Sequence, residues 1–343
     1  KIGVSSVSVH RALKGKEGVS NELRAKIIET SKEMGYVENY AAASIKRKTE
    51  RVAVVLPKGK WEKKMYFDYI WLGIKKSAKE LKGLNVEIIP FVCDDEEQQL
   101  AQLKEIAGEG PDSYGGVITL PFTRAPEILM QLQRLLALNI KVLVIDDHIT
   151  TPEGLMCIHP REVQVGKVAA EFASLVTPET GRVLVSGGRS DSKIHEGRLN
   201  SFCDYIKENK PGLTLDIIKG YTRKMDRKGE LYRNACEALD KNDDVCLMYA
   251  LTSHDNVAFV EALGRREGDK KVAIIGTDLN EETLEYLKQK EMVAVIDQNP
   301  YKKGYMAFNA MVDCLIKKLP VPDVMLCKID IALENNAELY NVQ

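Results

Sequence analysis

RVAVVLP, from Arg51 to Pro57, is an apolar strand-like run between a charged residue and a proline. A strand that is apolar on both of its faces is typical of a parallel sheet covered by helices on both sides. An amphipathic stretch near 67–82 follows this run, and the apolar run NVEIIPFV, from Asn85 to Val92, follows that stretch. This alternation of strand and helix patterns predicts an α/β fold.

The alternation continues through two successive sets of elements. The first set is completed by helices expected at 95–107 and 125–138 and by strands at 116–121 and 141–146. After the turn-rich TTPEG, from Thr150 to Gly154, strands are expected at 155–158, 182–186, 213–219, 244–249 and 271–276, and helices at 162–176, 195–209, 227–240, 255–264 and 281–288. The tail departs from simple alternation, with a strand at 293–296, a helix at 301–317 and a closing stretch that contains VMLC, from Val324 to Cys327. We therefore expect two doubly wound parallel-sheet lobes.

The segment before Arg51 has a different pattern. In GVSSVSVHRAL, from Gly3 to Leu13, Ser5 can cap a helix, and Val9, Ala12 and Leu13 form an apolar stripe at i, i+3 and i+4. The side chains expected to face outward include Ser6, Val7, His10 and Arg11. Ser20 then caps a second expected helix that ends at Gly35, with Leu23, Ile27, Ile28 and Met34 as inward candidates. Two short helices joined by a glycine-containing turn indicate a helix-turn-helix.

A basic joint, from Asn39 to Lys48, connects this pattern to the first strand. The whole start of the chain resembles that of the lactose/galactose repressor family. The resemblance rests on Val4-Ser5, Val9, Arg11 to Leu13, Val19-Ser20, Gly35-Tyr36, Asn39, Ala42 to Ile45 and the strand Val52 to Pro57. It implies a helix-turn-helix head at 1–38, a hinge at 39–50 and a periplasmic-binding-protein-like effector domain at 51–343. Family members carry a further helix before the turn, so the head is expected to be truncated.

The resemblance also implies how the lobes are built and how the head binds DNA. The first lobe is expected at about 51–150 and 295–320, and the second at about 151–294 and 321–343. The implied DNA-binding residues are Ser5, Ser6, Val7, His10 and Arg11 in the head, and Asn39, Ile45 and Lys46 in the hinge. A hinge helix would place the apolar side chain of Ile45 between base pairs in the minor groove.

Polar clusters that follow strands mark the expected ligand cleft, because ligands of such sheets bind beyond the carboxyl ends of the strands. The candidates, some on matching family positions, are Phe67, Asp146, His195, Arg198, His254, Asp255, Asp278 and Gln298. For any one of these acids taken alone, helix capping is the likelier explanation. Core packing explains Phe67 almost as well as ligand stacking does, and a surface ion pair is the alternative for Arg198. Asp146, Asp255 and Asp278 outnumber the single candidate cation Arg198, which favours a neutral polyol or an amine-bearing ligand.

Composition sets the class of protein. The 343 residues are 44% hydrophobic and 29% charged, which is ordinary for a soluble globular protein. Residues 1–51 hold 11 Lys and Arg against 6 Asp and Glu, a charge of +5, whereas the rest hold 38 against 44, a charge of −6. A basic head on an acidic body suits nucleic-acid binding by the head. The seven cysteines have no C-x-x-C spacing and are expected to be reduced, which fits a cytoplasmic protein.

These patterns together predict a transcription regulator, most simply a repressor. It is expected to be a homodimer that binds a roughly palindromic operator and a small molecule, with carbohydrate as the expected effector class, and to need no cofactor or metal. An extracytoplasmic solute-binding protein of a transporter is the alternative. A carbohydrate-active enzyme is a third possibility, but the chain contains no H-E-x-x-H, G-x-S-x-G or Walker-type motif, so we expect no enzyme.

Overall fold

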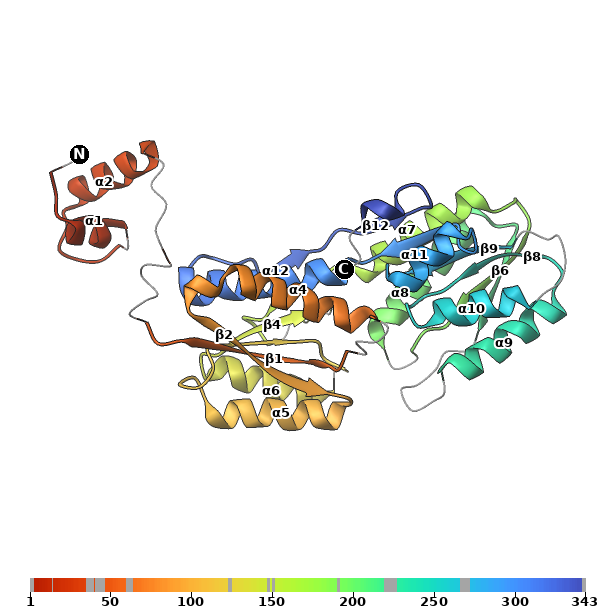
Figure 1. Ribbon diagram of the computed structural model, residues 1–343, viewed down its shortest axis with the longest axis horizontal. Coiled ribbons are helices and arrows are strands. Elements are labelled where there is room, and N and C mark those ends of the chain that lie inside the picture. Colours follow the sequence, from red (N-terminus) through yellow and green to blue (C-terminus); the bar gives the residue numbers. More distant parts are fainter. Residues whose placement is uncertain are drawn as a thin grey trace. The chain divides into compact units, whose positions relative to one another are not determined.

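The structure is a computed structural model in which the chain divides into two compact units, Lys1–Arg47 and Lys48–Gln343 (Figure 1). It describes residues 3–13, 15–34, 40, 47–59, 64–122, 125–146, 149, 152–189, 192–218, 227–265 and 272–340. Among these residues, no helix combines the length and the apolar character needed to cross a membrane. The predicted hinge residues Asn39, Ile45 and Lys46 lie outside the described residues.

The first unit contains two packed helices, α1 (Ser6–Leu13) and α2 (Asn21–Glu33). Both predicted capping serines are confirmed: the Ser5 hydroxyl accepts a hydrogen bond from the amide of Ser8 at 3.1 Å, and the Ser20 hydroxyl caps α2. Ala12 and Ile27 are buried between the helices, as their spacing predicts. The prediction for Met34 is wrong, because this side chain lies beyond the end of α2 and is 59% exposed.

The second unit contains two six-stranded sheets. The first has the order β11-β5-β4-β3-β1-β2 and the second the order β12-β10-β9-β8-β6-β7. The first sheet consists of β1 (Glu50–Pro57), β2 (Val86–Cys93), β3 (Gly116–Thr119), β4 (Lys141–Ile145), β5 (Met156–His159) and β11 (Val324–Leu326). The second consists of β6 (Gly181–Ser186), β7 (Leu213–Ile218), β8 (Val245–Tyr249), β9 (Ala273–Thr277), β10 (Ala294–Asp297) and β12 (Asp330–Ala332). All pairs are parallel except β10 with β12.

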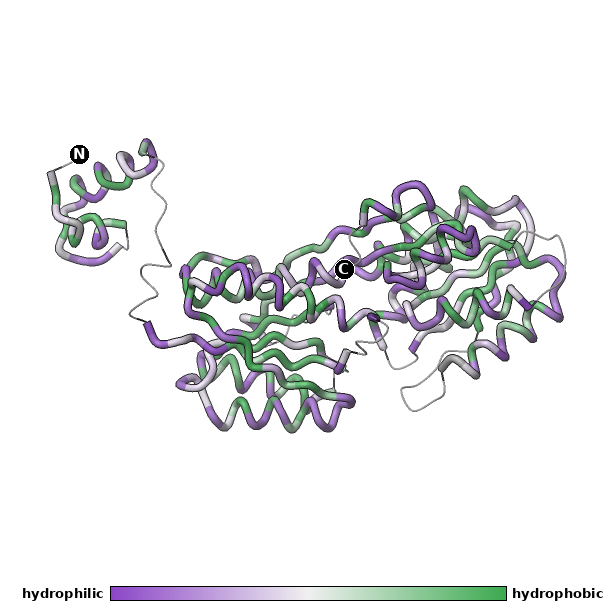
Figure 2. Tube along the Cα trace, viewed as in Figure 1, coloured by the Kyte–Doolittle hydropathy of each residue, from purple (hydrophilic) through white to green (hydrophobic). Residues whose placement is uncertain are grey.

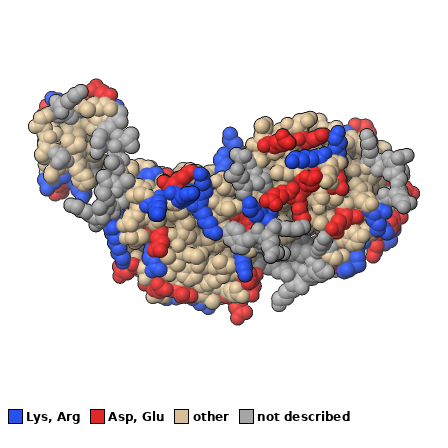
Figure 3. Space-filling view, viewed as in Figure 1, with Lys and Arg blue, Asp and Glu red and all other residues tan. Residues whose placement is uncertain are grey.

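Helices cover both faces of each sheet, as the apolar strands predict. On the first sheet, α4 (Tyr66–Glu80) and α12 (Pro300–Val312) lie on one face, and α5 (Glu96–Glu109) and α6 (Pro126–Ala137) on the other (Figure 1). On the second sheet, α7 (Glu162–Val176) and α8 (Lys193–Asn209) pack on one face, and α9 (Arg227–Lys241), α10 (Asp255–Gly264) and α11 (Glu281–Lys288) on the other. The central strands are hydrophobic (Figure 2), and charges of both signs alternate along the outer surface (Figure 3).

The points at which the chain crosses between the lobes correct the predicted lobe boundaries. β5 pairs in parallel with β4 and belongs to the first sheet, so the second lobe begins at α7 and not at residue 151. β10 belongs to the second sheet, β11 to the first, and β12 to the second. The turn-rich segment before β5 was misleading because it is a turn within the first lobe. The three-residue strand β12 was missed because so short a segment has no measurable periodicity.

α4 and α12 approach each other closely at two glycines. A Cβ atom on Gly73 would lie 2.0 Å from the carbonyl oxygen of Tyr301, and one on Gly304 would lie 2.1 Å from that of Ile70. No side chain fits at such distances, so the two backbones can pack this closely only with glycine at both positions. This contact holds the residue before Gly304, Lys303, in the interior of the first lobe, where it is fully buried.

Candidate functional site

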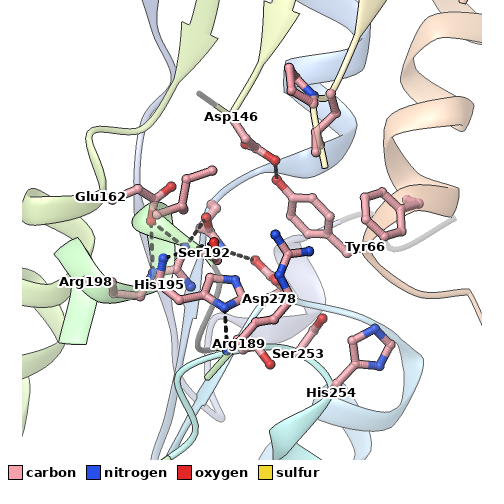
Figure 4. Close-up of a pocket in the computed structure, with 16 residues that line it drawn as sticks. Tyr66, Asp146, Glu162, Arg189, Ser192, His195, Arg198, Ser253, His254 and Asp278 are labelled. Atoms are coloured by element: carbon pink, nitrogen blue, oxygen red, sulfur yellow. Dashed lines mark hydrogen bonds and ion pairs between the residues drawn. The ribbon is translucent and has the colours of Figure 1, made fainter. Parts of the chain in front are cut away.

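A cavity of about 120 Å³ lies at the carboxyl ends of the strands of both sheets (Figure 4). The first lobe contributes Tyr66, Phe67, Leu120, Pro121 and Asp146 to its lining. The second lobe contributes Glu162, Arg189, Ser192, Ile194, His195, Arg198, Thr252, Ser253, His254, Asp278 and Gln298. This position agrees with the rule that open parallel sheets bind ligands beyond their strand ends.

The first lobe presents a buried cluster of a phenol, a carboxylate and an ammonium group. The hydroxyl of Tyr66, at the start of α4, donates to Asp146, which ends β4, and Figure 4 shows the two side chains pointing at each other. The Nζ of Lys303 donates to Asp146 and, at 2.8 Å, to the hydroxyl of Tyr66. Burial raises the pKa of Tyr66 well above its usual value, and the charge of Asp146 raises it further, so the phenol remains protonated.

Lys303 remains charged in this interior position. Burial alone would lower its pKa, but Asp146 and, more distantly, Glu162 outweigh that effect, and the pKa is raised. An ammonium group without exposure to water is tolerated only where a paired anion and hydrogen bonds replace its hydration. The first-lobe cluster is therefore an internal ion pair with no net charge.

The second lobe presents a hydrogen-bonded chain that starts at Arg198 on α8. Its Nε donates to Glu162 at 2.9 Å, its Nη1 to the carbonyl oxygen of Leu251 at 2.7 Å and its Nη2 to Oε1 of Gln298 at 2.7 Å. The amide of Gln298 then donates to Oδ1 of Asp278 at 2.9 Å. Arg198 is 2% exposed, so this is a buried structural ion pair and not the surface pair weighed as an alternative.

Glu162 offers the cavity an unused acceptor. Its Oε2 receives the bonds from Arg198, whereas its Oε1 is buried without a hydrogen-bond partner among the described residues. Burial raises the pKa of Glu162, and the nearby Arg198 offsets part of that effect. An unpaired buried acceptor costs about 1–3 kcal/mol. A ligand that donates a hydrogen bond to Oε1 would recover this energy.

Asp278 is a carboxyl group in the cavity whose pKa is shifted toward neutrality. Burial raises its pKa to about 7, the charge of Asp297 contributes to the rise, and Arg198 and Lys303 oppose it. Burial also raises the pKa of Asp297, to about 6. The second-lobe cluster therefore changes its charge by protonation in the physiological range.

Seven of the eight predicted effector residues line the cavity: Phe67, Asp146, His195, Arg198, His254, Asp278 and Gln298. Asp255 is the correction. It is 1% exposed and accepts hydrogen bonds from the hydroxyl of Ser186 at 2.7 Å and the amide of Thr252 at 3.1 Å. Asp255 therefore fixes the loop that leads into α10, which is the helix-start role expected of an acid in that position.

The excess of acids over cations is smaller than predicted. The sequence interpretation counted Arg198 alone, but Arg189 also lines the cavity and Lys303 lies directly behind Asp146. Arg189 donates from Nη2 to the carbonyl oxygen of Phe122 at 2.7 Å and so links the second lobe to the first. Three acids (Asp146, Glu162 and Asp278) and two cations line the cavity, and Lys303 and Asp297 behind them add one charge of each sign.

The walls between these polar clusters are apolar. The rings of Tyr66 and Phe67 meet edge to face with centroids 5.6 Å apart, and Leu120, Pro121 and Ile194 line the same cavity. Among the described residues, no group of three or more His, Cys, Asp or Glu is arranged to hold a metal ion. The site is therefore built for a polar molecule that has an apolar face.

A family model described as periplasmic binding protein domain matches residues 52–319. The chain belongs to this family. It is 22% identical to the D-allose-binding periplasmic protein of Escherichia coli (strain K12) over 252 residues, which cover 71% of this chain and 79% of the relative.

Solved structures show the same fold as this periplasmic binding protein domain. One was assigned as a LacI transcriptional regulator, from Bacteroides fragilis, with a TM-score of 0.75, 21% identity and coverage of 86% of this chain and 100% of that one. Another is a periplasmic solute-binding protein of an ABC transporter, from Actinobacillus succinogenes 130z, with bound D-allose, a TM-score of 0.74, 17% identity and coverage of 85% and 100%.

Proposed function

We propose that this protein is a transcription regulator, acting as a homodimer, whose affinity for operator DNA is controlled by a carbohydrate in the cleft between the two lobes. The observation that carries the proposal is the joining, in one chain, of a separate basic two-helix unit to a periplasmic binding protein domain. A binding domain alone would sense a small molecule. With the two-helix unit attached, ligand binding could control the affinity for DNA.

The geometry of the cleft supports a neutral polyhydroxylated ligand. Arg198 pairs with Glu162 and Lys303 with Asp146, so a strongly charged ligand would compete with these internal pairs. A sugar offers both hydroxyl donors, for an acceptor such as Oε1 of Glu162, and an apolar ring face, for a side chain such as Phe67. The bound D-allose of the structure from Actinobacillus succinogenes supports the same ligand class.

The exposed face of α1 supports DNA binding. Val7 is 57% exposed, and His10 and Arg11 are exposed on the same short helix. Such a helix reads the major groove through side chains near its start, while cations bind phosphates. Together with Ser5, Ser6, Asn39, Ile45 and Lys46, these are the residues that we propose bind DNA.

Ligand binding can be tested with the full-length gene product in a thermal-shift screen of neutral monosaccharides and disaccharides, sugar phosphates and sugar acids. A ligand at 100 times its Kd stabilises the folded state by about 2.7 kcal/mol. We expect the neutral sugars to contain the strongest stabiliser. Stabilisation by sugar phosphates or sugar acids alone would contradict the ligand class.

DNA binding can be tested by selecting binding sites from random DNA. We expect the full-length gene product to select a roughly palindromic sequence and Val7→Ala or Arg11→Ala to change or weaken that selection. Lys26→Ala, a change at an exposed position of α2, is the matched control and should leave the selected sequence unchanged. Failure to enrich any sequence would contradict the proposal.

A second candidate function is that of an extracytoplasmic solute-binding protein. It is favoured by the likeness to the periplasmic solute-binding protein of an ABC transporter from Actinobacillus succinogenes. A transcription regulator would be found in the cytoplasm, whereas a solute-binding protein of a transporter would be exported. Fractionation of cells that express the full-length gene separates the two. A bound sugar recovered unchanged would further support the proposal that the protein is no enzyme.

A further inference from the structure

A second, larger chamber adjoins the ligand cavity. It has a volume of about 600 Å³ and shares three of its lining residues, Asp146, Glu162 and Ile194, with the cavity. The chamber extends from these shared residues past the connection from β5 to α7 and the start of α8, where Gln164 and Gly197 line it. The cavity and the chamber are thus adjacent, and the residues between them come from both lobes: Asp146 from the first, and Glu162 and Ile194 from the second.

The cavity by itself is small for a ligand pocket. Pockets for small molecules measure roughly 300–1000 Å³. The cavity, at about 120 Å³, is smaller than this range, whereas cavity and chamber together fall inside it. A ligand confined to the cavity would leave the larger space to water.

Gly197 lines the chamber without a side chain. It lies inside the helix α8, where glycine costs roughly 0.5–1 kcal/mol relative to alanine. A Cβ atom on Gly73, Gly166 or Gly304 would collide with backbone atoms, but one on Gly197 would meet nothing within 4 Å. Gly108 on α5 is equally unobstructed, but Gly197 lies in the lining of the chamber, so a side chain added at Gly197 would extend into that space.

The chemistry of the chamber is polar and open to hydrogen bonding. The exposed side chains of Arg161, Gln164 and Lys193 line it together with His159, and Oε1 of Glu162 is buried without a partner among the described residues at the junction with the cavity. Arg161 takes a left-handed conformation, with φ of 58°, at the start of α7. Donors on both sides of a shared acceptor suit a second hydroxylated unit.

We propose that the ligand consists of two linked sugar units, one in the cavity and the other in the chamber. The inference rests on the proposed function, because it specifies the ligand of the same cleft. The linkage between the units would pass the shared residues Asp146, Glu162 and Ile194. Contacts in the chamber would then make a disaccharide bind more tightly than either of its component sugars.

Isothermal titration calorimetry of the full-length gene product tests this with matched probes: D-galactose and D-glucose against lactose, melibiose, maltose and cellobiose. We expect at least one disaccharide to bind about tenfold or more tightly than both of its component monosaccharides, which corresponds to about 1.4 kcal/mol. Monosaccharide binding that equals or exceeds all disaccharide binding would overturn the inference and leave the proposed function intact. Binding of no probe would instead overturn the carbohydrate part of the proposed function.

A variant that fills the chamber gives an independent test. Gly197→Leu adds a side chain where nothing lies within 4 Å, and Gly108→Leu does the same on α5, outside the lining of both spaces. We expect Gly197→Leu to weaken disaccharide binding about tenfold or more and to change monosaccharide binding little, and Gly108→Leu to change neither. Equal losses for both probes, or no loss, would overturn the placement of the second unit.

Discussion

Replacing Lys303 by methionine tests whether the interior of the first lobe depends on a buried ion pair. Lys303 is fully buried and donates to both Asp146 and the hydroxyl of Tyr66. Methionine keeps a similar shape but leaves the carboxylate of Asp146 buried without its cation. Removing one partner of a buried pair costs about 3–5 kcal/mol, so we expect the free energy of unfolding to fall by about that amount.

The assay is urea unfolding followed by the fluorescence of Trp71, in a Trp61→Phe background that leaves a single tryptophan. Trp71 is buried on α4, and its indole donates to the carbonyl oxygen of Pro57 at 3.0 Å, so it reports on the first lobe. Lys302→Met is the control, because Lys302 is the exposed neighbour on the same helix. The double variant Lys303→Met/Asp146→Asn should lose less than Lys303→Met alone, since it has no unpaired charge. A loss below about 1 kcal/mol in Lys303→Met, which is what a surface pair would give, would refute the reasoning.

Three further changes have expected outcomes. Burial raises the folded-state pKa of Asp278 to about 7, so the free energy of unfolding of the parent falls as pH rises from about 4 to about 7. Asp278→Asn lacks this titration, and its free energy of unfolding relative to the parent should rise by about 1.4 kcal/mol per pH unit in that window. Urea unfolding at several pH values measures the difference. Gly304→Ala should destabilise the protein by about 1–3 kcal/mol through backbone collision, whereas Gly108→Ala should be neutral or stabilising in thermal melts. Phe67→Ala should raise the Kd of the tightest-binding sugar about tenfold, as measured by calorimetry. An unchanged Kd would mean that Phe67 serves packing alone.

The sheets were predictable from sequence because their strands are apolar on both faces. The predicted strands RVAVVLP (51–57) and KVLVID (141–146) became β1 (Glu50–Pro57) and β4 (Lys141–Ile145), each with one boundary shifted by one residue. The lobe assignment was less predictable, since the segment before β5 has the composition of a boundary but is a turn within one sheet. The strands of the tail, β11 and β12, pair with strands far away in the sequence, and local periodicity does not predict such pairing.

The candidate site was likewise predictable only in part. Residues that follow strands, such as Asp146 and Asp278, were predicted because topology brings strand ends together. Lys303 and Glu162 were missed because they lie within or at the start of helices, where a charged residue normally faces water or caps the helix. The glycine after Lys303 was a usable signal, since a close helix crossing at Gly304 buries the residues beside it.

The most direct test of the proposed function is the affinity of the full-length gene product for its selected DNA, measured by fluorescence anisotropy with and without the tightest-binding sugar. We expect specific DNA binding whose Kd changes about tenfold or more when the sugar saturates the cleft, in either direction, because coupling between sites is typically worth 1–3 kcal/mol. The same sugar should leave the weak binding to random DNA nearly unchanged. A sugar that binds while the affinity for the selected DNA stays constant, or a protein that selects no DNA, would contradict the account.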